Sequence, residues 1–512
     1  MKTFFFYDLE TSGFSPREDR IMQFAGQRTN MNLEPIGEPI NLLVKLNDDT
    51  LPSPQAIMVT KITPQQTVAD GLSEAEFAKF LSEEIFTPDT ITVGYNSVRF
   101  DDEFIRHLFW RNFYDPYEWQ WKDGRSRWDL LDVVRLTRAI RGDGINWPFD
   151  EKGNPTNRLE LLTKLNNISH ESAHDALSDV AALIEVTKLI KQKQPQLFDY
   201  LLKMRDKKEV AKLINLEDKK PFVYASGRYP SETNKTTVAF PLTAGRNGNI
   251  IVYDLRHDPE ELLKLLNSPS VGEKSANSFQ KPSSPSQTTT YIPDGADRFA
   301  SSEAVLPDAQ CMTSSDEMGA SGKTFEISQL PKTIIKQLQY NRCPAIAPLG
   351  VLENENGWQK LNLDKETIEN NLKKLLARPD LAEKSREHFE NKPSFPKAPD
   401  PESALYDSFL PEGDKRKVET VRNADAKSLA DFAPDFLDER LPDLLIHYKA
   451  HSFPKSLTAD ESAKWETYRT ARLSAKSEQF MKDLSALAAT DADPYLLEEL
   501  KLWFESIFPS EY

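Results

Sequence analysis

Hydrophobic and polar positions alternate between strand-like and helix-like patterns along the first 190 or so residues. Dense, short apolar runs at 3–7 and 91–95 predict two buried strands. Helical spacing predicts four helices, over residues 73–85, 101–113, 128–140 and 175–190. Ser73 with Glu76 three residues later is typical of a helix start. Strands that alternate with helices favour an α/β layer fold.

From about residue 195 the pattern changes to short strand-like pieces separated by Gly, Asn and Pro, which predicts a small β-rich domain over 195–393. Within it, 268–323 is rich in Ser, Thr, Gly and Pro, so we interpret it as a flexible insertion. Four prolines in 391–402 predict a linker. Helical periodicity predicts an all-helical domain over 396–512, which leaves 1–190 as the first domain.

Composition narrows the class of protein. The 512 residues are 39% hydrophobic and 28% charged, and no apolar run approaches the roughly 18 residues that span a bilayer. Asp8 interrupts the first apolar run, so a signal-peptide core is not expected. Two cysteines, Cys311 and Cys343, exclude a disulfide scaffold and favour a cytoplasmic location. The net charge of -16 gives no support for nucleic-acid binding, which must rest on local patches.

Asp8 and Glu10 are the first candidate site residues, at the end of the first predicted strand. Residues two apart on a strand point the same way, so both carboxylates project from one face while Leu9 points into the core. Their Cα atoms are about 6.6 Å apart at about 3.3 Å per residue. Such a pair needs a cation or proton to neutralise it, and its oxygen ligands suit Mg²⁺ or Mn²⁺. An ordinary surface Asp-x-Glu remains the alternative.

Three further residues extend this pair. Asp101 stands where a predicted helix begins, and His174 and Asp179 stand at the start of another. With Asp8 and Glu10 they could converge on a two-metal centre that holds both oxygens of a phosphodiester displacement. His174 can take the proton of the attacking water, because the pKa of histidine lies near working pH. An ordinary surface histidine is the alternative.

The set Asp8-x-Glu10, Asp101 and His174-x4-Asp179 resembles the DEDD exonuclease superfamily in its His-type variant, which has an RNase-H-like fold. Longer motifs resemble the bacterial exodeoxyribonuclease I family. They are GYNSVRFDDE at 94–103, RNFYDPY at 111–117, SRWDLLD at 126–132, GINWP at 144–148, QPQLFDY at 194–200, NRCP at 341–344 and residues 448–454. The resemblance covers nearly the whole chain except 268–323.

The resemblance implies an RNase-H-like exonuclease domain followed by an SH3-like β-barrel and an all-α C-terminal domain, which together enclose a strand. It implies processive, Mg²⁺-dependent removal of 5′-mononucleotides from the 3′ end of single-stranded DNA, in repair and recombination. It implies two Mg²⁺ ions held by Asp8, Glu10 and Asp179, with Mn²⁺ as the other candidate. Expected partners are single-stranded DNA and the C-terminal tail of single-strand-binding protein, and we expect a monomer.

The resemblance also implies strand contacts. Arg158 would hold the terminal nucleotide, although a surface salt bridge is the alternative for it, and Glu10 would bind substrate as well as metal. The other implied contacts are Arg106, Tyr117, Trp121, Arg135, Lys336, Asn341 and Tyr406. Independently, residues 99–141 hold ten aromatic side chains and nine Lys or Arg against eight Asp or Glu, which favours strand binding by stacking. We assign four of those rings to the core: Phe100, Phe104, Phe109 and Trp110.

Two alternative functions stay open. An RNA-trimming or proofreading 3′-to-5′ exonuclease would share the chemistry, but such enzymes are usually compact, and some 300 further residues count against them. A non-catalytic single-strand clamp needs no clustered carboxylates, which repel phosphate in the absence of a cation.

Overall fold

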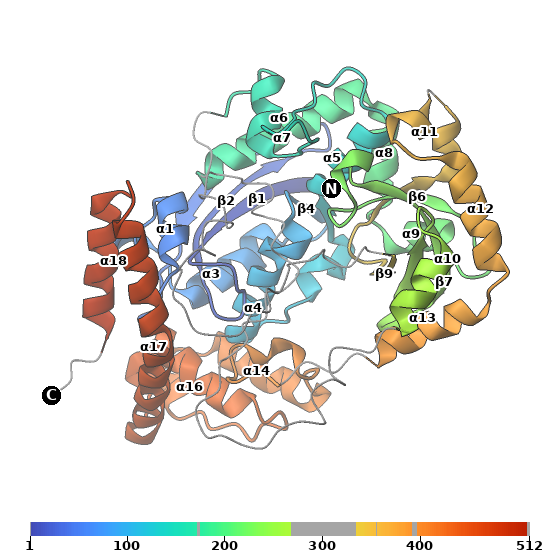
Figure 1. Cartoon of the computed structure of the whole chain (residues 1–512). Coiled ribbons are helices and arrows are strands. Elements are labelled where there is room, and N and C mark those ends of the chain that lie inside the picture. The colour runs from blue at the N-terminus through green and yellow to red at the C-terminus, as the bar shows by residue number, and fades with distance from the viewer. Residues whose placement is uncertain (1, 171–174, 268–333, 355, 392–396, 509–512) are drawn as a thin grey trace, which may run out of the picture.

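The computed structural model describes residues 2–170, 175–267, 334–354, 356–391 and 397–508. The predicted insertion at 268–323 lies outside the described residues, as does His174. Figure 1 shows a first sheet in the middle, a second sheet with its helices on one side, and the C-terminal helices along the other. The described helices are too short or too polar to cross a membrane.

The first sheet has the order β3-β2-β1-β4-β5. β1 pairs with β2, and β2 with β3, in antiparallel fashion, whereas β1–β4 and β4–β5 are parallel. Its strands are β1 (Thr3–Thr11), β2 (Ile21–Thr29), β3 (Ile40–Leu43), β4 (Thr90–Gly94) and β5 (Ser126–Asp129). β1 is central and buried on both faces, which explains its continuous apolar run.

Helices cover both faces of this sheet. The alternation of β1 sends Phe4 and Phe6 into a core shared with α5 and α7, and Phe5 and Tyr7 into a core shared with α3 and α4. The helices are α1 (Pro54–Thr60), α2 (Pro64–Asp70), α3 (Glu74–Phe80), α4 (Asp101–Arg111), α5 (Leu130–Ile140), α6 (Leu159–Leu165) and α7 (Ala176–Lys193). The predicted α/β arrangement is confirmed, and Ser73 forms the capping box of α3.

The sequence predicted the start of α5 two residues too early and did not predict β2 or β3. Trp128 lies on β5, where it pairs with Val93, and α5 begins only after Asp129. The side chain of Asp129 caps α5 by accepting a hydrogen bond from the backbone N–H of Leu131. β2 and β3 were not predicted.

The second sheet is wholly antiparallel, with the order β10-β6-β7-β8-β9. Its strands are β6 (Phe222–Ala225), β7 (Thr236–Ala244), β8 (Ile250–Asp254), β9 (Ile335–Leu338) and β10 (Ala345–Pro348). Around it lie α8 (Pro195–Lys203), α9 (Lys207–Leu213), α10 (Pro259–Asn267), α11 (Gly357–Lys360), α12 (Lys365–Leu376) and α13 (Asp380–Glu390). The predicted strand-like pieces are confirmed, whereas α8 to α13 add helices to a region expected to be β-rich.

The C-terminal part is helical, as predicted. It contains α14 (Lys415–Asn423), α15 (Ala426–Ala430), α16 (Leu441–Ser452), α17 (Ala459–Ala488) and α18 (Pro494–Ile507). Two apolar clusters fasten it to the first part of the chain. Trp110 and Phe113 pack with α16, and Ile57 of α1 packs with α17 and α18.

Candidate active site

Three of the predicted carboxylates come together. Asp8, Glu10 and Asp179 each offer an oxygen, and these oxygens lie within 4.8 Å of one another. Asp8 and Glu10 share the face of β1 that packs on α7, and Asp179 lies in the first turn of α7. Asp8 and Glu10 are 8% and 9% exposed, so the charges repel at short range unless a cation compensates them. The all-oxygen donor set fits Mg²⁺.

Asp101 lies outside this group of three. It is the first residue of α4 and is 1% exposed. The hydroxyl of Tyr7 on β1 donates to Asp102, the residue after Asp101, so the start of α4 lies beside β1. The predicted role of Asp101 stays a prediction, and so does that of His174, which lies outside the described residues.

His170 is a site residue that the sequence analysis did not single out. Its Nε2 lies 2.6 Å from Oδ1 of Asp179, and its Nδ1 lies 3.1 Å from the hydroxyl oxygen of Thr163. The side chain is 4% exposed, so both contacts are shielded from solvent. Its position four residues before His174, in the same segment, is the feature of the sequence that could have indicated it. The contact fixes the orientation of one candidate metal ligand.

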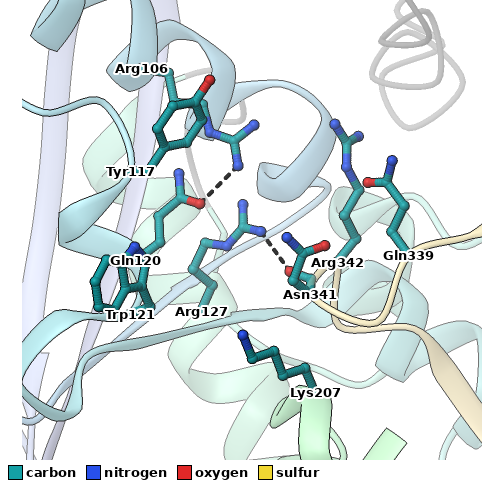
Figure 2. Close-up of a pocket in the computed structure, with 9 residues that line it drawn as sticks. All are labelled: Arg106, Tyr117, Gln120, Trp121, Arg127, Lys207, Gln339, Asn341 and Arg342. Carbon is teal, nitrogen blue, oxygen red and sulfur yellow. Dashed lines mark hydrogen bonds between the residues drawn. The ribbon is translucent and has the colours of Figure 1, made fainter. Parts of the chain in front are cut away.

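A cavity of about 460 Å³ lies where α4, β5, α9 and the turn after β9 meet, and four Lys or Arg side chains line it (Figure 2). Four of the predicted strand contacts line it. The lining contains no Asp or Glu, but Glu103 pairs with Arg106 and Arg342, and Asp102 pairs with Arg127, just outside it. The lining residues are Arg106, Tyr117, Gln120, Trp121, Arg127, Lys207, Gln339, Asn341 and Arg342. Of these, only Arg106, Tyr117, Trp121 and Asn341 were predicted as strand contacts from the sequence.

Neighbouring groups hold the cavity side chains in place. Arg106 donates to Gln120 at 2.8 Å, and its guanidinium lies 5.5 Å from the centre of the Tyr117 ring. Arg127 donates to the backbone oxygen of Asn341 at 2.7 Å, which joins β5 to the turn after β9. Trp121 is 64% exposed and presents a free-standing ring beside these cations. Cationic side chains that can pair with phosphates, next to an exposed ring on which bases can stack, are what binding of a single-stranded nucleic acid requires.

The remaining predicted contacts lie outside the cavity lining. Arg135 donates to Asp132 at 2.7 Å, and Lys336 donates to the Ser226 hydroxyl at 2.5 Å with its ammonium 4.6 Å from the Tyr224 ring centre. Burial, and next the charge of Arg99, lower the pKa of Lys336 to about 7.

Arg158 and Tyr406 occupy two other places. Arg158 precedes α6 and donates to Glu160 at 2.6 Å, which is the salt bridge considered as its alternative. Tyr406 lies beside the cavity, because its hydroxyl is 3.4 Å from Arg106 and donates to Glu103.

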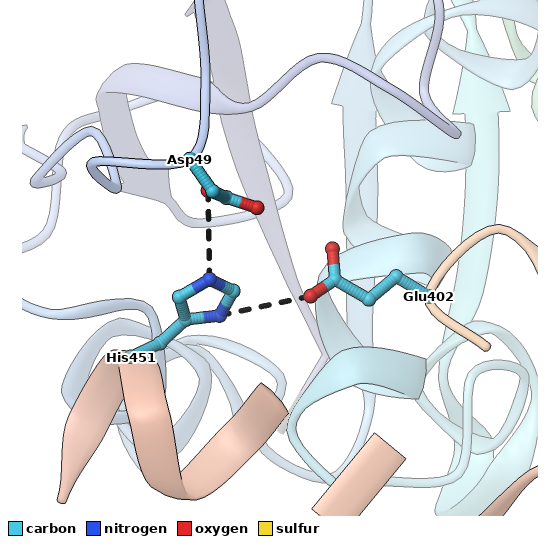
Figure 3. Close-up of side chains that lie close together, drawn as sticks. All are labelled: Asp49, Glu402 and His451. Atoms are coloured by element: carbon cyan, nitrogen blue, oxygen red, sulfur yellow. Dashed lines mark ion pairs between the residues drawn. The ribbon is translucent and has the colours of Figure 1, made fainter. Parts of the chain in front are cut away.

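A second cluster of potential metal ligands joins Asp49, Glu402 and His451 (Figure 3). His451 lies 3.5 Å from Asp49 and 3.8 Å from Glu402. Two arginines already neutralise these carboxylates: Arg472 lies 3.5 Å from Asp49, and Arg20 pairs with Glu402. Burial alone would raise the pKa of Glu402, but the charge of Arg20, together with the hydrogen bond from His447 and the charges of His451 and His447, outweighs burial, and the pKa lies well below its usual value. We interpret the cluster as a buried ion-pair network rather than a metal site.

Comparison with known families gives three matches in chain order. The Exonuclease family matches residues 5–187, the Exonuclease I SH3-like domain matches 205–269 and 323–391, and the Exonuclease I C-terminal domain matches 399–507. These matches confirm the α/β, SH3-like and helical parts expected from the sequence.

Individual relatives are similar along most of their length. Exodeoxyribonuclease I of Haemophilus influenzae is 38% identical over 493 residues, 96% of this chain and 95% of that protein. A crystal structure of Escherichia coli exonuclease I with a dA16 oligonucleotide has a TM-score of 0.83 at 32% identity, covering 99% of this chain and 100% of that one. A crystal structure named as SSB/exonuclease I in complex with an inhibitor has a TM-score of 0.80 at 32% identity, with coverage of 99% and 100%.

Proposed function

Because the chain belongs to the exodeoxyribonuclease I family, we propose that it removes nucleotides one at a time from the 3′ end of single-stranded DNA. The observation that carries the proposal is the meeting of Asp8, Glu10 and Asp179 within 4.8 Å. The cavity supports a nucleic-acid substrate despite the net charge of -16, because its four Lys or Arg side chains outnumber the two carboxylates, Glu103 and Asp102, that pair with them.

The proposed reaction is hydrolysis of the last phosphodiester bond. Asp8, Glu10 and Asp179 would hold two Mg²⁺ ions, which when bound supply positive charge against the attacked phosphodiester. His174 accepts a proton from the attacking water, whose oxygen forms a bond to phosphorus. The bond from phosphorus to the 3′ oxygen of the preceding nucleotide breaks, and that oxygen takes a proton from solvent. The products are a 5′-mononucleotide and a shortened strand with a 3′ hydroxyl.

The strand-binding residues are proposed on the same basis. Arg158 would hold the terminal nucleotide, Glu10 would also contact the substrate, and the cavity would bind the strand behind it. Cations such as Arg106 meet phosphates whatever the sequence, and stacking on Trp121 contributes about 1–3 kcal/mol per base with any base. Tyr117 and Asn341 of the cavity lining and Tyr406 beside it would add further contacts, and Arg135 and Lys336 would add contacts outside it.

Enclosure of the strand by three domains would make the reaction processive, because an enclosed strand is cut again before it leaves. We propose the division 1–190, 195–393 and 396–512 for these domains. The tail of single-strand-binding protein is proposed as a partner, supported by the relative named with SSB. A monomeric state, a cytoplasmic location and a role in repair stay predictions.

Digestion of oligonucleotides labelled at either end, with Mg²⁺ and with EDTA, tests the proposed function. We expect shortening from the 3′ end of single-stranded DNA only, and a loss of about a thousandfold in rate for Asp8→Asn, because a group that acts in the transition state is removed. Asp70→Asn, at an exposed position, is the matched control. Undiminished hydrolysis by Asp8→Asn would overturn the metal-site assignment, and faster digestion of matched RNA would favour the RNA-trimming alternative.

A further inference from the structure

Glu103 is a point where three distant segments of the chain meet. Its carboxylate accepts a hydrogen bond from Arg106 at 2.6 Å, one turn along α4. It also accepts from Arg342 at 3.4 Å, in the turn that follows β9. A third donor is the hydroxyl of Tyr406, which precedes the C-terminal helices. Helix α4 beside the first sheet, the turn after β9 of the second sheet and the C-terminal part are thus joined through the side chain of Glu103.

The electrostatics of Glu103 support a strong junction. Burial alone would raise the pKa of its carboxyl, but the charges of Arg106 and Arg342 outweigh it and the pKa lies below its usual value. The side chain is 15% exposed, so the ionised carboxylate is poorly solvated by water. Hydrogen bonds to an ionised acceptor are about twice as strong as neutral ones. Loss of any of the three donors leaves a shielded charge with weaker compensation.

Glu103 lies outside both the cavity lining and the group of candidate metal ligands. Arg106 and Arg342 line the cavity, whereas Glu103 does not. It is also absent from the group formed by Asp8, Glu10 and Asp179. We propose that Glu103 is a positioning residue: it fastens the three parts of the molecule around the bound strand and so sets how many nucleotides are removed in one encounter. This inference rests on the proposed function.

A strand that lies between three parts of the molecule escapes sideways only when two of them separate. Separation at this junction breaks a charge-assisted hydrogen bond to Glu103, so the junction slows dissociation. The hydrolytic step needs no movement of Glu103. Weakening the junction therefore shortens processive runs without slowing the cleavage of a substrate too short to be enclosed.

The test variant is Glu103→Gln, which keeps the size of the side chain and removes its charge. A long labelled strand is bound first, and heparin is added with Mg²⁺ so that each strand is digested in a single encounter. We expect the number of nucleotides removed to fall about tenfold, the effect of one lost charge-assisted hydrogen bond on dissociation. On a trinucleotide we expect kcat to stay unchanged.

Glu118→Gln is the matched control, because Glu118 forms an exposed pair with Lys122 at 2.8 Å in the same region and the change of net charge is equal. Control run lengths should equal those of the unaltered protein. Unchanged run lengths for Glu103→Gln would overturn the inference, and so would an equal loss on long and short substrates. If Glu103→Gln fails to fold, Glu103→Asp, which keeps the charge but is one methylene shorter, must show the same selective loss. Failure of the unaltered protein to digest DNA would instead contradict the proposed function.

Discussion

Lys336 carries a charge that depends on pH in the physiological range. Its ammonium is buried beside Tyr224, and burial, followed by the charge of Arg99, lowers its pKa to about 7. A lysine with this pKa is mostly charged at pH 6 and mostly neutral at pH 9. The folded chain therefore binds fewer protons than the unfolded chain between about pH 7 and the ordinary lysine pKa of about 10.4. Stability is lowered by the buried charge below pH 7 and rises with pH through that window.

The same titration should govern the contribution of Lys336 to strand affinity. We expect Lys336→Met to weaken binding of a single strand at pH 6 and to have little effect at pH 9, because only the charged ammonium attracts phosphate. Fluorescence anisotropy with a labelled strand in EDTA measures binding without hydrolysis. Lys152→Met, at an exposed position, is the control. An equal loss of affinity at both pH values would contradict this assignment.

Among the secondary-structure elements, the sequence predicted best those whose position depends on interactions between residues close together in the chain. The apolar run of β1 and the capping box at Ser73 were predicted because each is formed by residues that lie close together in the sequence. β2 was missed because its buried Gln23 and Gln27 break the apolar pattern. Gln23 is satisfied by Asn41 of β3 at 2.9 Å, a partner that the sequence of β2 cannot indicate. Trp128 was placed on a helix for the same reason, since pairing with β4 overrides its helical spacing.

The caps of α3 and α7 allow a matched comparison. The side chain of Asp175 accepts from the backbone N–H of Ser178 at 3.1 Å and begins α7, whose first turn carries Asp179. We expect Asp175→Ala and Ser73→Ala each to lower the free energy of unfolding by about 1 kcal/mol in urea titrations. Only Asp175→Ala should also reduce hydrolysis, since it loosens the turn that holds Asp179. Equal activity of the two variants would show that this cap does not support the site.

On the scale of the whole molecule, the candidate site shows where prediction from sequence stops. The spacing of Asp8 and Glu10 placed both on one face, but their approach to Asp179, some 170 residues later, depends on how α7 packs on the sheet. The family resemblance supplied that pairing. It did not supply His170 or Glu103, because their roles arise from contacts that only the folded chain forms.

The Asp49, Glu402 and His451 network joins the first part of the chain to the C-terminal helices. Glu402→Gln removes the buried partner of Arg20, and we expect it to lower the free energy of unfolding by about 3–5 kcal/mol. Urea titration followed by tryptophan fluorescence measures the change. Glu353→Gln, which breaks an exposed pair with Lys365, is the control and should leave stability unchanged. Similar stability of Glu402→Gln and the control would show that the network is not what attaches these helices.

Cys343 follows Arg342 directly, is buried, and donates from its thiol to the backbone oxygen of Arg127 at 3.1 Å. Burial raises the pKa of this thiol to about 12, so almost none of it is thiolate at neutral pH. An alkylating reagent therefore meets a reactive sulfur only in moments when β5 and the segment after β9 part. With Cys311 replaced by serine, the rate of covalent labelling of Cys343 therefore measures how often the contact between β5 and the segment after β9 opens.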